Sequence, residues 1–143
     1  MPLVGNTKQN KETSLEDFYR GLQKEKDPFL SSVSDSMLEF IGLINEMFPK
    51  TTIWGLTSHA RLVLQTADQW DAEWFVIVKS LGNEFEFNYL MPDDTKPWAG
   101  ARVTGGTRSL ADARLYLLIA MRESGGWEDN EELKQLLAAN DLT

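Results

Sequence analysis

The chain has 143 residues, a net charge of -8 and no cysteine. This length fits one domain, and the 42% hydrophobic and 25% charged residues are ordinary for a globular protein. The lack of cysteine excludes a disulfide framework, a thiolate zinc site and a cysteine nucleophile. The negative charge disfavours direct binding to nucleic acid or anionic membranes, and it favours a protein partner with a basic surface.

The N-terminal segment and the hydropathy pattern bear on location. No apolar run approaches the ~20 residues that a membrane-spanning helix needs. Residues 1–11 hold only Leu3 and Val4 as large aliphatic residues, so we expect no secretory signal and a cytoplasmic protein. The polar composition of residues 1–12 predicts a flexible N-terminal arm, followed by a single α+β domain over residues 13–143.

Two helices are predicted in the first third of the chain. Thr13 with Glu16, or Ser14 with Asp17, has the spacing of a capping box, and apolar residues follow at helical intervals. Asp27-Pro28 is expected to end this helix. A second, largely apolar helix is predicted to begin near Ser34 or Asp35 and to stop at Pro49.

The middle of the chain changes to strand patterns, with two-residue alternation and β-branched or aromatic runs. Gly82-Asn83 has the composition of a tight hairpin turn, and a two-residue turn there places Lys79 opposite Glu86. Gly105-Gly106 is expected to break the last, short strand. The predicted strands cover residues 51–56, 61–66, 74–80, 84–90 and 101–104.

Two further helices are predicted near the C-terminus. Ser109 has the spacing of a cap, Gly125-Gly126 supplies a helix end, and Asp129 or Asn130 caps a short acidic helix to about Asn140. The order of elements predicts an α+β fold with an antiparallel meander sheet of four to five strands. Two N-terminal and two C-terminal helices would pack mainly on one face of that sheet.

Three short segments, each considered by itself, have residues that could form a catalytic or ligand-binding site. His59 is the only histidine and could act as a general base, but its place between two strands is typical of a turn. The adjacent carboxylates of Asp93 and Asp94 could bind a divalent cation, but the EF-hand ligand pattern is missing. The glycines at 105–106 precede a helix without a phosphate-loop motif. We therefore predict no catalytic residue, no cofactor and no metal.

The acidic residues are clustered. Residues 84–94 contain four acids and no base, and residues 123–132 contain five acids and no base. Acids of this kind steer a basic partner, and a nearby tryptophan can supply the retained affinity. The residues predicted to contact a partner are Asp93, Asp94, Trp98, Trp127, Glu128 and Asp129.

No segment carries a family motif. In size and charge the chain is similar to small acidic bacterial or phage accessory proteins, such as toxin-neutralising immunity proteins and inhibitors of nucleic-acid-binding enzymes. This similarity is one of composition. The leading hypothesis is a non-enzymatic binding protein that docks a basic protein partner. The alternatives are a structural or adaptor domain without a charge-driven partner, and a small enzyme that uses His59, Asp93 or Asp94. The sequence assigns neither the partner's identity nor the oligomeric state.

Overall fold

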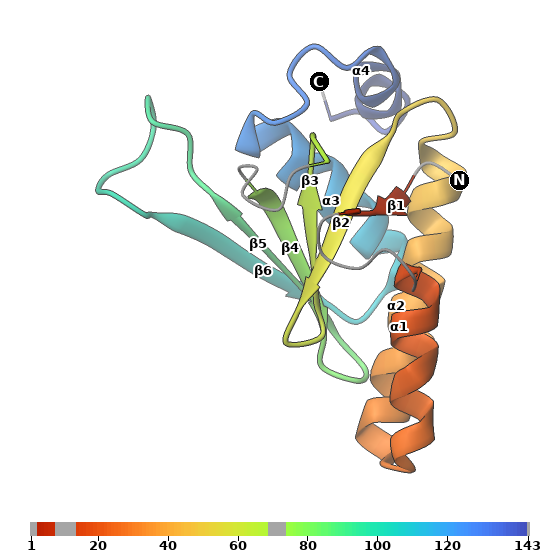
Figure 1. The fold of residues 1–143 in the computed structure, drawn as a ribbon. Coiled ribbons are helices and arrows are strands. Elements are labelled where there is room, and N and C mark those ends of the chain that lie inside the picture. Colours follow the sequence, from red (N-terminus) through yellow and green to blue (C-terminus); the bar gives the residue numbers. More distant parts are fainter. Residues whose placement is uncertain (1–2, 8–13, 69–73, 143) are drawn as a thin grey trace.

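The computed structural model describes residues 3–7, 14–68 and 74–142 of the chain. Over these residues the protein forms a six-stranded sheet with helices packed against it, which confirms the predicted α+β class (Figure 1). The helices are α1 (Leu15–Leu22), the 3₁₀ turn η1 (Gln23–Glu25), α2 (Pro28–Met47), α3 (Leu110–Ser124) and α4 (Glu131–Ala139). The strands are β1 (Leu3–Gly5), β2 (Ile53–Ser58), β3 (Arg61–Gln65), β4 (Trp74–Ser80), β5 (Phe85–Leu90) and β6 (Arg102–Thr107).

The sheet follows the order of the sequence from β1 to β6, and β2 to β6 form an antiparallel meander. The predicted hairpin register is confirmed, because Lys79 lies directly opposite Glu86 and its Nζ is 3.4 Å from Oε1 of that carboxylate. The turn closes through a hydrogen bond of 2.7 Å from the Leu81 N–H to the Glu84 carbonyl.

The N-terminal segment differs from the prediction of a flexible arm. Leu3–Gly5 forms β1 and pairs in parallel with β2 at the edge of the sheet. The Leu3 side chain is buried, and its N–H donates to Oδ1 of Asn45 at 2.9 Å. Asn6 donates to the buried side chain of Gln65 at 2.9 Å. Residues 8–12, which the same prediction included, lie outside the described residues.

The helix starts follow from local capping. The Ser14 hydroxyl accepts from the Asp17 N–H at 3.1 Å, as the capping-box spacing predicts. The predicted start of the second helix was wrong, because α2 begins at Pro28 rather than near Ser34. Asp27 caps it by accepting from the Phe29 N–H at 2.8 Å, and proline is well suited to the first helical position.

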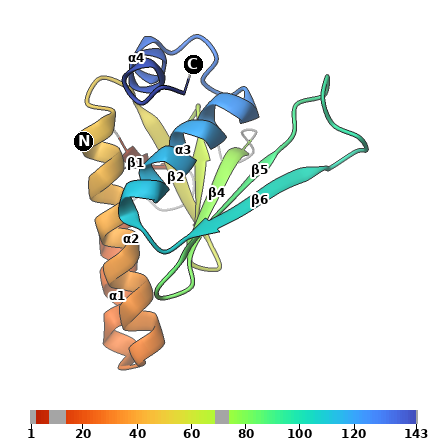
Figure 2. The ribbon, with the colours of Figure 1, turned by 180° about the vertical axis from the view of Figure 1, so that it is seen from behind.

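The main helices α2 and α3 cover one face of the sheet, as predicted (Figure 2). Phe40 of α2 packs against Phe85 and Phe87 of β5, with ring centroids 5.6 and 5.7 Å apart. α1 packs beside α2, and α4 packs on α3. No helix of the described residues is long and apolar enough to cross a membrane.

The expected break at Gly105-Gly106 was also wrong, because β6 runs through both glycines to Thr107. A Cβ on Gly106 would lie 2.5 Å from Oε1 of Glu84, and one on Gly105 would lie 3.6 Å from the Tyr116 ring. The Glu84 side chain therefore lies over Gly106 and would have to move for a larger residue, whereas the Tyr116 ring lies at an ordinary contact distance from Gly105.

Candidate functional site

The clearest feature of the surface is an arm formed by β5, β6 and the loop of residues 91–101, called here the arm loop. The arm extends to one side, away from the helices that cover the rest of the sheet (Figures 1 and 2). The loop has its own backbone hydrogen bonds, including one of 2.9 Å from the Met91 N–H to the Ala101 carbonyl. The Lys96 N–H donates to the Pro92 carbonyl at 3.0 Å. These bonds give the loop a defined conformation for presenting its side chains.

Trp98 is the most exposed large hydrophobic side chain among the described residues, at 70% of its full accessibility. The backbone carbonyl of the same residue accepts from the Ala101 N–H at 3.2 Å. The main chain at Trp98 is thus held in place while its indole faces solvent. An indole in this state offers a large, stiff apolar surface to a partner.

Asp93 and Asp94 are both exposed on the arm loop, as predicted. Lys96 donates to Oδ1 of Asp93 at 2.7 Å, and this hydrogen bond, followed by the lysine's charge, lowers the pKa of Asp93 below its ordinary value. Within the described part of the chain, Asp94 has no ion-pair partner. The arm loop therefore carries one compensated and one uncompensated carboxylate in addition to the exposed indole.

The second acidic segment is the turn of residues 125–130 between α3 and α4, called here the α3–α4 turn. Gly125 ends α3 in the left-handed conformation with φ 82°, and Asn130 caps α4 by accepting from the Leu133 N–H at 2.8 Å. Glu128 and Asp129 between them are exposed. Trp127 is only 5% exposed, so it belongs to the core, and its prediction as a contact residue is corrected by this burial.

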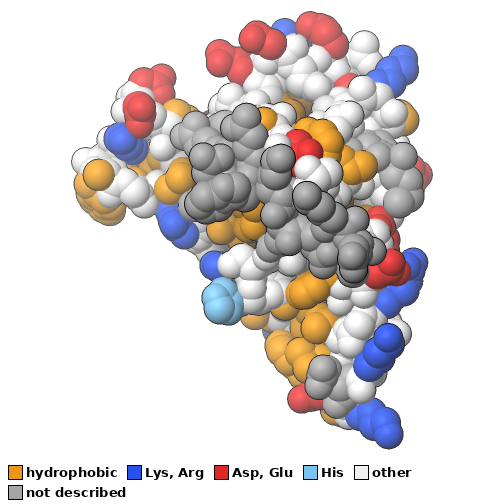
Figure 3. All heavy atoms as spheres, in the orientation of Figure 1, with side chains coloured by type: hydrophobic (Ala, Val, Ile, Leu, Met, Phe, Trp, Pro, Cys, Tyr) orange, Lys and Arg blue, Asp and Glu red, His pale blue; other side chains and the backbone are white. Residues whose placement is uncertain are grey.

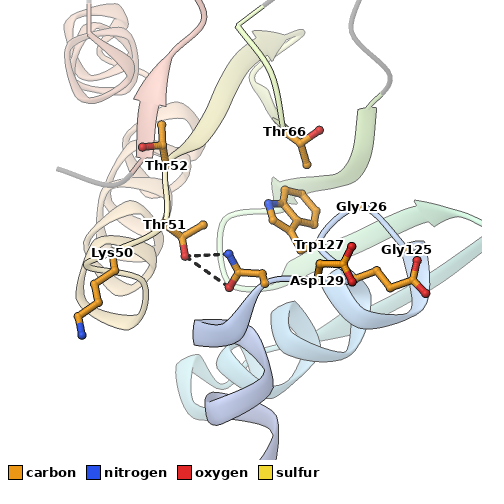
Figure 4. A pocket seen from close by; sticks show the side chains of 10 residues that line it. Lys50, Thr51, Thr52, Thr66, Gly125, Gly126, Trp127 and Asp129 are labelled. Atoms are coloured by element: carbon orange, nitrogen blue, oxygen red, sulfur yellow. Dashed lines mark hydrogen bonds between the residues drawn. The ribbon is translucent and has the colours of Figure 1, made fainter.

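A polar hollow of about 560 Å³ separates the α3–α4 turn from the start of β2 and the end of β3. Figure 4 shows the Trp127 indole on the wall of this hollow and the Lys50 side chain pointing away from it. The Asn130 amide donates to the Thr51 hydroxyl at 3.1 Å, and that hydroxyl donates to Glu132 at 2.8 Å. These bonds tie the C-terminal part of the chain to the α2–β2 connection.

Asp and Glu side chains gather over α4 and over the arm loop, both at the upper end of the view in Figure 3. The acidic run of residues 84–94 is not one surface, because Glu84 and Glu86 lie near the start of β5 and only Asp93 and Asp94 lie on the arm loop. Of the predicted contact residues, Asp93, Asp94, Trp98, Glu128 and Asp129 are exposed. Contact of these residues with a partner stays a prediction.

The residues of the enzymatic alternative are not brought together. His59 is exposed in the two-residue turn between β2 and β3, where its φ is 52°. In the meander, this turn and the arm loop lie at opposite ends of the strands, and the pale-blue histidine in Figure 3 lies well below the loop's acids. No group of three His, Asp or Glu side chains suited to a metal ion occurs in the described ranges.

Comparisons of this chain with protein-family models, with curated protein sequences and with solved structures gave no match. Function must therefore be argued from the surface itself.

Sequence reasoning missed one part of this surface, the apolar side chains of Val103 and Tyr116, which are 38% and 36% exposed. The sequence feature that could have revealed them is the two-residue alternation of side chains along the hairpin strands. Val103 pairs with Tyr89 and shares its face of the sheet, but α3 does not extend far enough to cover Val103 fully.

Proposed function

We propose that this chain is a non-enzymatic acidic binding protein that docks a basic protein partner, as an immunity- or inhibitor-like accessory protein does. The observation that carries the proposal is the 70% exposed Trp98 on a hydrogen-bonded loop that also carries the uncompensated carboxylate of Asp94. Burial of apolar surface stabilises by about 25 cal/mol per Å², and an exposed tryptophan side chain does not gain this free energy in the free protein. A partner that covers this indole recovers that free energy.

Exposed acids outside the arm loop are also suited to a basic partner. Glu128 and Asp129 have no ion-pair partner within the described ranges, and both face solvent. Exposed acids attract a basic protein over about a Debye length and mainly raise the association rate. The buried aromatic contact then mainly sets the dissociation rate. We place this activity in the cytoplasm.

The proposal is tested first by affinity capture from the native host, with mass spectrometry to identify the captured proteins. Trp98→Ala is compared with Phe29→Ala, since Phe29 is also exposed, at 54%, but lies at the start of α2. The expected result is a basic protein captured by the wild type and by Phe29→Ala and lost from Trp98→Ala. Removal of the indole is expected to cost about 2 kcal/mol, which is about thirtyfold in Kd.

Association kinetics with the captured protein test the role of charge. Neutralising Asp93 and Asp94 together is expected to slow association and to flatten its dependence on salt. The matched control neutralises Glu39 and Glu46, which are exposed on α2 and change the net charge by the same amount. If the two double variants have equal effects, Asp93 and Asp94 act only through the net charge of the protein and not as a specific contact surface. That result is expected for the structural or adaptor alternative.

A further inference from the structure

The strand β6 forms one edge of the described sheet and pairs only with β5 among the described residues (Figures 1 and 2). Proteins commonly protect such an edge by proline, lysine, a bulge or a very short strand. The opposite edge is protected in the last way, because β1 has three residues. β6 has six residues, includes neither proline nor lysine, and pairs with β5 without a shift in register. Its edge is therefore open to pairing with a further strand.

The backbone groups that face this open edge follow from the alternation of an antiparallel pair. The Met91 N–H donates to the Ala101 carbonyl at 2.9 Å, so the carbonyl of Ala101 faces the β5 side. Alternation from that bond directs the N–H and C=O groups of Thr104 and Gly106 away from β5. Both residues are exposed, and no backbone hydrogen bond outside the described helices and strands involves either of them. They offer donors and acceptors to a neighbouring strand.

We propose that the edge of β6 pairs with the same edge of a second copy of this chain, antiparallel about a twofold axis at Thr104. In this register Thr104 lies opposite its own counterpart, and Arg102 lies opposite Gly106 of the second copy. The outward-facing backbone groups then meet each other, as the hydrogen-bonded pairs of an antiparallel ladder require. This inference goes beyond the proposed function and does not depend on it.

The charges along the edge agree with this register. The Glu84 side chain lies over Gly106, where a Cβ would be 2.5 Å from its Oε1, and it forms no ion pair within the described ranges. Arg102 of the second copy lies opposite Gly106 and therefore next to Glu84, and the twofold axis repeats this contact. A guanidinium has five N–H donors, so it can serve several acceptors at once. A shift by two residues would instead place Arg102 opposite Arg108, and like charges directly opposite are destabilising.

The helix-covered face of the edge is complementary to itself in the same register. Val103, which is 38% exposed, lies opposite Gly105 of the second copy. The Tyr116 ring lies over Gly105, 3.6 Å from the place of a Cβ, and is 36% exposed. Val103 of one copy thus comes to lie beside the Tyr116 ring of the other. Glycine within a strand often marks the close approach of another backbone, and both glycines of β6 serve that purpose here.

The expected dimer is a weak one. The pairing edge has six residues, which is short for a permanent interface. Each copy has a net charge of -8, so the two copies repel each other at long range. We therefore expect sedimentation velocity of the full chain at physiological salt to show a monomer–dimer equilibrium with a Kd in the micromolar range.

Charge reversals test the register. Arg102→Glu and Glu84→Arg each place like charges opposite each other at two symmetric positions, so each is expected to raise the Kd about tenfold or more. An equimolar mixture of the two variants restores both opposite-charge contacts in a heterodimer and is expected to recover the association of the wild type. Arg20→Glu is the matched control, since it changes the net charge equally but lies on α1. It is expected to leave the Kd unchanged.

Cross-linking tests the position of the axis. The chain has no cysteine, so one introduced thiol can react only with its counterpart in a second copy. Thr104→Cys places the two thiols opposite each other, with a Cα separation of about 5.5 Å that a disulfide spans. Mild oxidation is expected to give a covalent dimer. Thr107→Cys, on the same strand, places the two thiols about 20 Å apart and is expected to remain uncoupled.

A chain that stays monomeric over the whole concentration range would overturn the inference, as would a dimer that the charge reversals do not weaken. The mixture of the two reversed variants must associate better than either variant alone, with circular dichroism showing that both are folded. Failure to do so also overturns the inference, and so does equal cross-linking at positions 104 and 107. None of these results bears on the Trp98 surface, which capture of the basic partner tests separately.

Discussion

Trp98 and Trp127 allow one substitution to be compared in two environments. Trp127 is 5% exposed and Trp98 is 70% exposed. A fully buried tryptophan removes roughly 150–250 Å² from water, and apolar burial stabilises by about 25 cal/mol per Å². Removal of a buried tryptophan side chain typically costs about 3–5 kcal/mol, since a cavity is left behind. We expect Trp127→Ala to lower the free energy of unfolding by that amount.

The same calculation for Trp98 gives a small effect. About a third of its surface is buried, so Trp98→Ala is expected to cost at most about 2 kcal/mol, an upper value because unfolded chains also bury apolar surface. Urea unfolding followed by far-ultraviolet circular dichroism measures both variants without relying on tryptophan fluorescence. Equal destabilisation, or a larger loss in Trp98→Ala, would refute the assignment of Trp127 to the core and Trp98 to the binding surface.

Substitutions of Tyr19 and Glu132 test hydrogen bonds between distant parts of the chain. Burial raises the pKa of Tyr19 well above its ordinary value, so the folded chain keeps a proton that the unfolded chain loses above about pH 10. The free energy of unfolding should therefore be unaffected by this group below pH 10 and fall as the pH rises above it. Tyr19→Phe should flatten that fall in urea titrations at several pH values, at a cost near neutrality of about 1 kcal/mol for the 3.0 Å hydrogen bond to the Ala60 carbonyl. Glu132→Ala removes the acceptor of the Lys50 N–H and the Thr51 hydroxyl and should cost about 1–2 kcal/mol by the same measurement, whereas Glu132→Gln should cost less. An unchanged Glu132→Ala variant would show that these bonds do not hold α4 in place.

The parts of the fold that local chemistry controls were predictable. The Gly82-Asn83 turn determines the hairpin register, because a two-residue loop leaves one alignment in which Lys79 faces Glu86. The hydroxyls of Ser14 and Ser109 cap their helices at the predicted spacing. In each case the controlling contact lies within a few residues of the chain.

The parts that depend on distant contacts were not predictable. β1 has only three residues, and it is recognisable only through its pairing with β2 some fifty residues later. Gly105 and Gly106 resemble a break until Tyr116 and Glu84 are seen to pack over them. Asp27-Pro28 was expected to end the first helix, but α1 already ends at Leu22 and η1 at Glu25, and Asp27-Pro28 instead starts α2.

Part of the candidate surface was likewise predictable from the sequence and part was not. The exposure of Asp93, Asp94 and Trp98 follows from a polar loop with two prolines, which a sequence reveals. Trp127 stands among glycines and acids, so its neighbours suggested solvent. Its burial comes from its packing in the hydrophobic core, whose other members are distant in the sequence, so no local pattern records it.

The sequential order of the sheet has a consequence for how the chain folds. β2 to β6 each pair with the next strand along the chain, so these contacts close short loops. Among the strand pairings of the described residues, only that of β1 with β2 closes a long loop, and α4 reaches even further back along the chain, to Lys50 and Thr51 through Glu132. We expect the meander with α2 and α3 to form first and the two ends of the chain to dock last. Amide hydrogen exchange should then show the shortest-lived protection in β1 and α4, and the longest in β3 and β4.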